Sequence, residues 1–269
     1  MRCVLFQFSG TGNTWYVAQA LKQSFEALGM ACSVISLETA HDAASLIDAA
    51  DVVGLGYPIY GSDFPEPVAR WLEALLHNPS KRAFVYCTQF RYSGDGAAIG
   101  ARALREKGYS VRQLMHVNMP NNITDYRLVR WLKPASPERL ISYVNRKANR
   151  LAEAVKADQR LYKGETIMSL LLGLVQRIPF RRGREAAKST LKVAACCVGC
   201  GRCAMLCPSG NLTIEANVAK PSNRCYLCYR CINHCPVQAL HFAKRAKVIR
   251  PYRGPVPDFE IDRVRKHIK

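Results

Sequence analysis

Acidic residues are few in this chain of 269 residues, which holds 20 Asp and Glu against 39 Lys and Arg. The formal net charge of +19 gives a field that attracts acidic proteins, nucleic acids and anionic membranes rather than basic partners. The excess is uneven, because residues 1–160 carry a net +5 and residues 161–269 a net +14. We therefore expect the second part of the chain to present most of the positive charge.

Long apolar runs are also missing. The residues after Met1 and Arg2 form a short apolar stretch with no small-residue cleavage site, which predicts a first β-strand and a cytoplasmic protein. The most apolar internal run, residues 167–175, is too short to span a bilayer. It predicts a helix that links two domains, and weak contact with a membrane surface is the alternative because basic residues flank it.

The loop of residues 9–14 has no lysine or arginine. Without a Gly-Lys-Ser/Thr ending it does not match the nucleoside-triphosphatase loop, and Trp15 stands where a dinucleotide-binding loop needs its third glycine. Glycines, hydroxyls and an amide at a predicted helix start can instead wrap a phosphate with backbone N–H groups. An ordinary capped turn is the alternative. The candidate cofactor-binding residues are Ser9, Gly10, Thr11, Gly12, Asn13 and Thr14.

Strand-like apolar runs alternate with amphipathic helical stretches through residues 1–158. The predicted strands are residues 2–8, 32–37, 52–56, 83–88 and 110–118. The predicted helices include residues 13–28, 65–76, 96–108 and 136–155. This alternation predicts an α/β domain with a doubly wound, five-stranded parallel sheet.

Cysteine is abundant, with twelve residues, and eight of them form two copies of a Cys-x2-Cys-x2-Cys-x3-Cys-Pro run that lie 28 residues apart. This is the ligand spacing of paired [4Fe-4S] clusters, in which the fourth cysteine of each run binds the other cluster. The spacing therefore assigns two ligand sets. The first is Cys197, Cys200, Cys203 and Cys235, and the second is Cys225, Cys228, Cys231 and Cys207.

Two other uses of these cysteines fit less well. A disulfide framework needs an export signal, and a zinc site gives no reason for a third cysteine two residues further on. We predict that His234 and His241 are packing or surface residues, because eight thiolates already complete both clusters. The cysteines outside the runs, predicted to be small buried apolar residues, are Cys3, Cys32, Cys87 and Cys196.

With both motifs in place, the chain resembles the family of proteins that fuse a flavodoxin-like domain to a bacterial-type two-cluster ferredoxin domain. The loop of residues 9–14 matches the flavodoxin pattern Ser/Thr-x-Thr-Gly-x-Thr at each fixed position, and the cysteine runs match the ferredoxin pattern. The resemblance implies sheet order 2-1-3-4-5, with FMN at the carboxyl ends of the strands. Residues 159–195 correspond only by position.

The resemblance also implies two loops around the flavin ring. The residues carried over to them are Pro58, Ile59, Tyr60 and Gly61 after the third strand, and Thr88, Gln89, Phe90, Ser93, Gly94 and Asp95 after the fourth. Tyr60 or Tyr57 would stack on the ring, unless each is an ordinary half-buried aromatic residue. Residues 118–122 follow the fifth strand into the same crevice. Arg91, with Arg127 or Arg130, departs from the acidic loops of many flavodoxins, so redox potential and partner choice do not carry over.

The expected organisation is an FMN-binding domain over residues 1–158, a helical connection over 159–187, a ferredoxin domain over 188–244 and a basic tail over 245–269, which would wrap the ferredoxin domain or meet a partner. This domain organisation predicts electron transfer between FMN and two [4Fe-4S] clusters, and an acidic protein as redox partner. A reductase of a small-molecule substrate, fed through the clusters, is the alternative, with Tyr60, Tyr92 or Asp95 as proton donor. A nucleic-acid-binding protein is less favoured, because no such motif appears.

Overall fold

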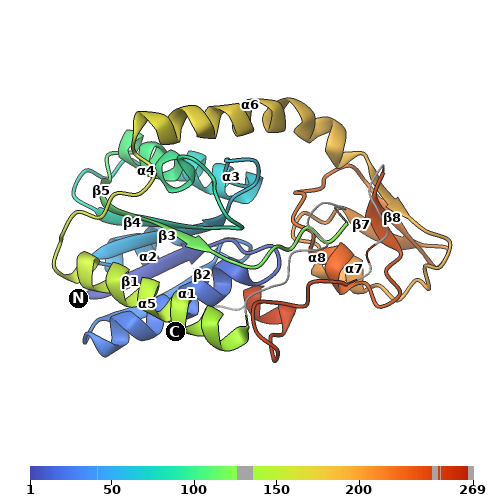
Figure 1. Ribbon diagram of the computed structural model, residues 1–269, viewed down its shortest axis with the longest axis horizontal. Coiled ribbons are helices and arrows are strands. Elements are labelled where there is room, and N and C mark those ends of the chain that lie inside the picture. Colours follow the sequence, from blue (N-terminus) through green and yellow to red (C-terminus); the bar gives the residue numbers. More distant parts are fainter. Residues whose placement is uncertain (41, 126–135, 244–247, 249, 266–269) are drawn as a thin grey trace.

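The computed structural model describes residues 1–40, 42–125, 136–243, 248 and 250–265 (Figure 1). The predictions for Arg127 and Arg130 lie outside these described residues.

A parallel sheet of five strands forms the centre of the first domain, in the order β2-β1-β3-β4-β5. Its strands are β1 (Arg2–Gln7), β2 (Ala31–Ser36), β3 (Val52–Pro58), β4 (Arg82–Gln89) and β5 (Ser110–Asn118). Each predicted strand is present, with ends that differ by no more than two residues. The predicted flavodoxin-like order is therefore confirmed, and β1 lies between β2 and β3 at the point where the strand order reverses.

Helices cover both faces of this sheet (Figure 1). One face packs against α1 (Asn13–Ala27) and α5 (Pro137–Lys156), and the other against α2 (Ala43–Ala49), α3 (Glu66–Ala74) and α4 (Gly96–Glu106). Successive side chains of a strand point to opposite faces, so Leu5 joins the first core and Phe6 the second. Burial on both faces explains why the strands read as continuous apolar runs.

A long helix, α6 (Ile167–Lys188), joins the two parts of the chain and runs along the outside of α3 and α4 (Figure 1). Its N-terminus is capped by Thr166, whose Oγ1 accepts a hydrogen bond from Ser169 N at 3.1 Å. Within the described residues, no helix is long and apolar enough to cross a membrane.

The cysteine-rich part folds around two short antiparallel pairs. β6 (Leu191–Val193) pairs with β9 (Leu240–Phe242), and β7 (Leu212–Glu215) pairs with β8 (Val218–Pro221). Each cysteine run contains a five-residue helix, α7 (Arg202–Leu206) or α8 (Arg230–His234), and these helices lie 28 residues apart. The residues before them, Gly201 and Tyr229, share the left-handed conformation. The sequence repeat is therefore also a repeat of structure.

The described part of the tail contacts both domains. Gln7 Nε2 donates to Val264 O at 3.3 Å, and Thr39 Oγ1 donates to Arg265 O at 3.1 Å, within the 3-10 helix η2 (Ile261–Arg265). On the ferredoxin side, Tyr252 N donates to Asn233 Oδ1 at 2.8 Å. The tail thus contacts the cysteine-rich part, one of the two outcomes predicted for it, and also the first domain, which was not predicted.

Candidate cofactor sites

The candidate phosphate loop, residues 9–14, lies at the carboxyl end of β1 and is almost completely buried. Ser9 Oγ accepts hydrogen bonds from Gly12 N and Trp15 N, both at 3.2 Å, and so holds the turn onto the start of α1. Thr14 Oγ1 lies 2.8 Å from Thr88 Oγ1, which connects this loop to the end of β4. The predicted loops after β1 and β4 are therefore neighbours in space.

Two glycines of the loop allow close approach by the rest of the chain. A Cβ atom on Gly10 would lie 2.7 Å from Tyr60 Oη and 2.8 Å from Cys228 O. Gly12 has φ 101°, which favours glycine, and a Cβ atom there would collide with the ring of Phe259. The loop is thus enclosed by the second cysteine run near Gly10 and by the tail near Gly12.

The chemistry of the loop fits a flavin phosphate. Ser9 Oγ accepts from Trp15 N in the first turn of α1, but the N-cap residue Gly12 has no side chain to cap the helix and no acidic residue lies in that turn, so the remaining N–H groups suit an anion. Thr11 Oγ1 accepts a hydrogen bond from Asn122 Nδ2 at 2.9 Å and keeps its own proton to donate. Asn13 differs, because its side chain donates to Pro120 O and accepts from Tyr252 Oη. Ser9, Thr11 and Thr14 remain the side chains predicted to hold the phosphate.

The two candidate tyrosines after β3 have different surroundings. Tyr57 is a core residue, because its buried hydroxyl donates to Gly96 O at 2.7 Å and accepts from Gly100 N at 3.1 Å. Tyr60 lies against Gly10, and its buried hydroxyl has no hydrogen-bond partner among the described residues. Burial raises the pKa of Tyr60 well above its ordinary value. Of the two, Tyr60 lies nearer the phosphate loop, and its role toward a flavin stays a prediction.

The loop after β4 is divided between an exposed part and a buried part. Phe90 and Tyr92 are exposed beside Gln89, whose Nε2 donates to Asn118 Oδ1 at 2.8 Å. This bond brings the start of the segment 118–122 to the same crevice. Asp95 is fully buried instead, and both of its oxygens are paired, one with Arg102 and one with Arg177 of α6. Asp95 therefore anchors α6, and its paired oxygens do not support a proton-donor role.

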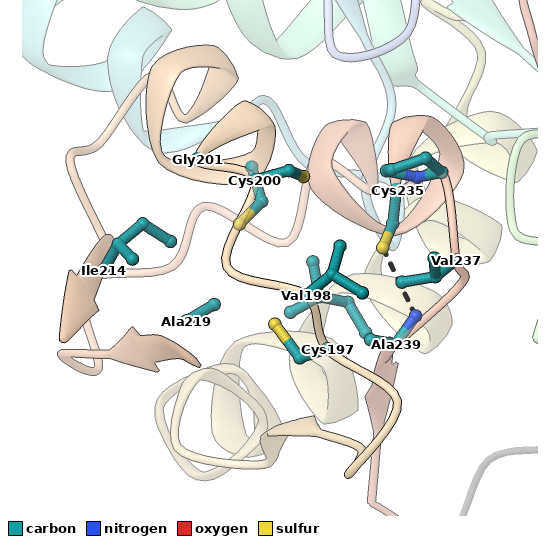
Figure 2. A pocket seen from close by; sticks show the side chains of 12 residues that line it. Cys197, Val198, Cys200, Gly201, Ile214, Ala219, Cys235, Val237 and Ala239 are labelled. Atoms are coloured by element: carbon teal, nitrogen blue, oxygen red, sulfur yellow. Dashed lines mark hydrogen bonds between the residues drawn. The ribbon is translucent and has the colours of Figure 1, made fainter. Parts of the chain in front are cut away.

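The first predicted ligand set surrounds one cavity (Figure 2). Cys197, Cys200, Cys203 and Cys235 line a pocket that is partly open to solvent. Apolar residues make up the rest of the lining, namely Val198, Ile214, Ala219, Pro236, Val237, Ala239 and Leu240 together with Gly201. Four thiols around an apolar volume are what a cubane cluster requires. The crossing of Cys235 to the first run is visible in this arrangement.

The second predicted set lies deeper. Cys225, Cys228 and Cys231 are buried, and Cys207 is partly buried. Burial raises the pKa of Cys228 to about 12 against the lowering effect of Arg230, and the thiols of Cys225 and Cys207 raise it further. Burial also raises the pKa of Cys231, to which the neighbouring thiols, including Cys203 of the first set, contribute. The charge of a thiol in one set is therefore felt by a thiol of the other.

Backbone groups support the crossing cysteines in the same way in both repeats. Asn211 N donates to Cys207 Sγ at 3.2 Å, and Ala239 N donates to Cys235 Sγ at 3.3 Å (Figure 2). Within the described residues no three His, Cys, Asp or Glu side chains are placed to hold a single metal ion. The four thiols of the first set line one pocket, an arrangement that suits the ligands of a multi-iron cluster.

The remaining cysteines and histidines are mostly internal. Cys3, Cys32 and Cys87 are buried as predicted, whereas Cys196 is exposed, so the prediction of burial was wrong for that residue. The reason is position, because Cys196 lies in the connection that leads into the first cavity. His234 is a buried packing residue and His241 is half-buried.

Arg230 joins the second cysteine run to the phosphate loop. Its guanidinium donates to Ser9 O at 2.7 Å and Gly10 O at 2.9 Å, and also to Leu206 O. It also forms a buried ion pair, at 2.5 Å, with Glu38 in the segment after β2. Glu38, Arg177 and Phe259 are site residues that the sequence did not reveal, because their partners are distant in the chain.

Asparagines provide a second connection between the domains. Asn233 Nδ2 donates to Asn122 O at 2.9 Å, and Thr124 Oγ1 donates to Asn233 Oδ1 at 2.9 Å. Asn122 also holds Thr11 of the phosphate loop. The cysteine-rich part is thus hydrogen-bonded to the first domain at two separate points, the loop of residues 9–14 and the segment after β5.

Comparison with known families matches residues 196–239 to the 4Fe-4S dicluster domain. None of the curated proteins matches this chain. The chain therefore combines a flavodoxin-like fold, defined by its strand order, with a 4Fe-4S dicluster region.

Solved structures of low identity resemble part of the chain. Flavodoxin 1 from Bacillus cereus is 21% identical over 58% of this chain and 98% of its own, with a TM-score of 0.45. A Streptococcus pneumoniae flavodoxin is 19% identical over 56% of this chain and 97% of its own, with a TM-score of 0.41. Rubredoxin:oxygen oxidoreductase from Desulfovibrio gigas is 21% identical over 58% of this chain, with a TM-score of 0.45. The matched region spans only 36% of that oxidoreductase.

Proposed function

We propose that this protein transfers electrons between a bound FMN and two [4Fe-4S] clusters. The observation that carries the proposal is the contact between the candidate sites, where Gly10 of the phosphate loop lies against the backbone of the cluster ligand Cys228. When bound, FMN would supply paired or single electron exchange and each cluster single electron exchange. Covalent fusion would keep the carriers at a high effective concentration.

The contribution of the chain in this proposal is to fix which site lies next to which. The set of Cys207, Cys225, Cys228 and Cys231 is the nearer one, because Cys228 contacts Gly10 and Arg230 holds the phosphate-loop carbonyls. The other set is less buried, because Cys200 is exposed and Cys197 half-buried. This order supports a linear arrangement from flavin loop to buried cysteines to outer cysteines.

The outer set offers a route to a partner. Cys200 is exposed, and Val198 and Val237 of the same cavity are 61% and 37% exposed. We propose that a redox partner protein docks here, and that its surface is acidic because this chain has a net charge of +19. A small-substrate reductase receives less support, since both oxygens of Asp95 are ion-paired and the hydroxyl of Tyr60 is buried.

The test uses two matched cysteine variants of the full protein, prepared without oxygen. Cys228→Ser removes a ligand of the nearer set and Cys200→Ser a ligand of the outer set. We expect each variant to lose about half of its iron and to keep its flavin. Flash reduction with a one-electron donor then measures how fast flavin and remaining cluster equilibrate.

The two variants should differ in that rate. We expect Cys228→Ser to slow equilibration at least about tenfold and Cys200→Ser to leave it nearly unchanged, because only the first loses the adjacent carrier. Thr11→Ala serves as the reciprocal control and should weaken flavin binding while iron content stays constant. A protein that binds no flavin, or a Cys228→Ser variant that equilibrates at the wild-type rate, would contradict the proposal.

A further inference from the structure

Helix α6 has one face that is fully used inside the molecule. Gly173 packs onto Gly94 of the loop after β4, and Arg177 pairs with Asp95 and donates to Ser62 O at 2.8 Å. One turn further on, Arg181 pairs with Asp63 at 2.6 Å. These contacts fix the helix on the two loops predicted to surround the flavin ring.

The opposite face of α6 is apolar and exposed. Ile167, Met168, Leu171, Val175 and Ile178 are 79%, 63%, 52%, 71% and 45% exposed. From Met168 onward these residues are spaced by three or four positions, and Ile167 lies beside Met168 at the start of the helix, so they form one row along it. We call this row the outer stripe of α6.

A stripe of this kind is unusual on a soluble surface. Of the 17 large apolar side chains that are exposed among the described residues, seven belong to α6, so the exposed apolar surface is concentrated on one element. The aromatic residues Phe90, Tyr92 and Tyr162 are exposed on the segments next to its N-terminal half. Contiguous exposed apolar surface marks an interaction site rather than ordinary scatter.

Basic residues accompany the outer stripe. Residues 159–188 contain seven Lys and Arg but only two Asp and Glu. Arg160 and Lys163 are exposed before the helix, and Arg182 is exposed in line with the stripe. An apolar row with cations at both ends complements an anionic surface that has an apolar interior.

The shape of the region favours a bilayer over a globular partner. α6 stands as a single ridge along one edge of the molecule, with no neighbouring helix beside its outer face (Figure 1). Its 22 residues give a length of roughly 33 Å at the rise of an α-helix. We propose that α6 lies on the surface of an anionic lipid bilayer and inserts its outer stripe between the lipid headgroups. This proposal is independent of the electron-transfer function.

The test is flotation of the intact holoprotein with two kinds of vesicle. One contains phosphatidylcholine and phosphatidylglycerol in a ratio of about three to one, and the other contains phosphatidylcholine alone. We expect at least tenfold stronger binding to the anionic vesicles, weakened by 0.5 M salt, because both apolar insertion and anionic attraction contribute.

A double variant and a control variant distinguish binding through the outer stripe from non-specific binding to vesicles. The Leu171→Gln/Val175→Gln variant should lose at least about tenfold in binding to the anionic vesicles. Leu76→Gln is the matched control, because Leu76 is 74% exposed but lies outside α6, and it should bind as the wild type does. Equal flavin and iron contents in all three proteins show that each is folded.

A fluorescent side chain on the outer stripe detects insertion into the bilayer directly, without a measurement of vesicle affinity. Val175→Trp should shift its emission to shorter wavelength when anionic vesicles are added, whereas Leu76→Trp should not. Absence of any vesicle binding, or undiminished binding of the double variant, would overturn the proposal. So would a dimer in analytical ultracentrifugation that the double variant dissolves, since the outer stripe would then join two copies of this chain.

Discussion

At the scale of single residues, Arg230 has the most connected side chain between the two domains. It is fully buried, contacts the carbonyls of Ser9 and Gly10, and is paired with Glu38. Burial lowers the pKa of Arg230, but the hydrogen bond and charge of Glu38 outweigh this and raise it overall. The guanidinium therefore stays charged beside the second cysteine set.

We expect Arg230→Met to destabilise the protein by about 3–5 kcal/mol, because it leaves the buried carboxylate of Glu38 without its main partner. The measurement is the urea midpoint of the anaerobic holoprotein, followed by flavin fluorescence. Flavin affinity should also fall, since the carbonyls of the phosphate loop lose their support.

The double variant Arg230→Met/Glu38→Gln is the control for the unpaired charge. It should recover most of the lost stability but not the flavin affinity, because the bridge to the phosphate loop is still absent. A double variant as unstable as Arg230→Met alone would show that the ion pair is not the cause.

The site residues that the sequence could predict belong to motifs in which the spacing of neighbouring residues indicates the role. The cysteine runs imply their crossed partners without any structure, and the order of glycines and hydroxyls implies the phosphate loop. Arg230 could not be identified in this way, because Glu38 lies 192 residues earlier in the chain. A pairing of that range becomes visible only when the two domains are packed together.

At the scale of elements, α6 depends on one glycine for its position. A Cβ atom on Gly173 would collide with Asp95, whereas a Cβ atom on Gly183, ten residues later in the same helix, would meet nothing. The two glycines thus share a helix and differ in what lies against them.

We expect Gly173→Ala to destabilise the protein by about 1–3 kcal/mol, because the added methyl group forces α6 away from the loop after β4. Gly183→Ala should stabilise it by up to about 1 kcal/mol through helix propensity alone. Thermal unfolding of the two variants under identical conditions measures the difference. Equal changes in both would show that α6 is not docked as described.

The elements themselves were largely predictable, and their docking was not. Apolar alternation located all five strands of the first sheet, whereas the 28-residue repeat indicated the ligand sets but not the paired helices α7 and α8. For α6 the sequence showed an apolar run but not which side faces inward. That choice is made by Arg177 and Arg181, which pair with Asp95 and Asp63 of distant loops.

At the scale of the whole molecule, the tail crosses the boundary between the two domains and packs against both. The ring of Phe259 packs beside Gly12 and lies 5.6 Å from the ring of Trp15, centre to centre. Tyr252 reaches Asn13 at 2.5 Å from the same segment. The tail therefore covers the candidate phosphate loop from outside.

We expect Phe259→Ala to raise the flavin dissociation constant by about two- to tenfold, the factor that corresponds to loss of one aromatic pair. Fluorescence titration of the flavin-free protein measures it. Tyr252→Phe, which removes only the hydroxyl bond to Asn13, should have a smaller effect. Tighter flavin binding in Phe259→Ala would contradict a supporting role of the tail and show that the ring obstructs the loop.

We propose above that one chain holds a flavin and two clusters in adjoining sites. The most direct measurement is an anaerobic preparation in which FMN, iron and sulfide are counted per chain, followed by reductive titration. We expect about one FMN, about eight iron and eight sulfide ions, and uptake of about four electrons. Iron without flavin, or only about four iron ions per chain, would contradict it.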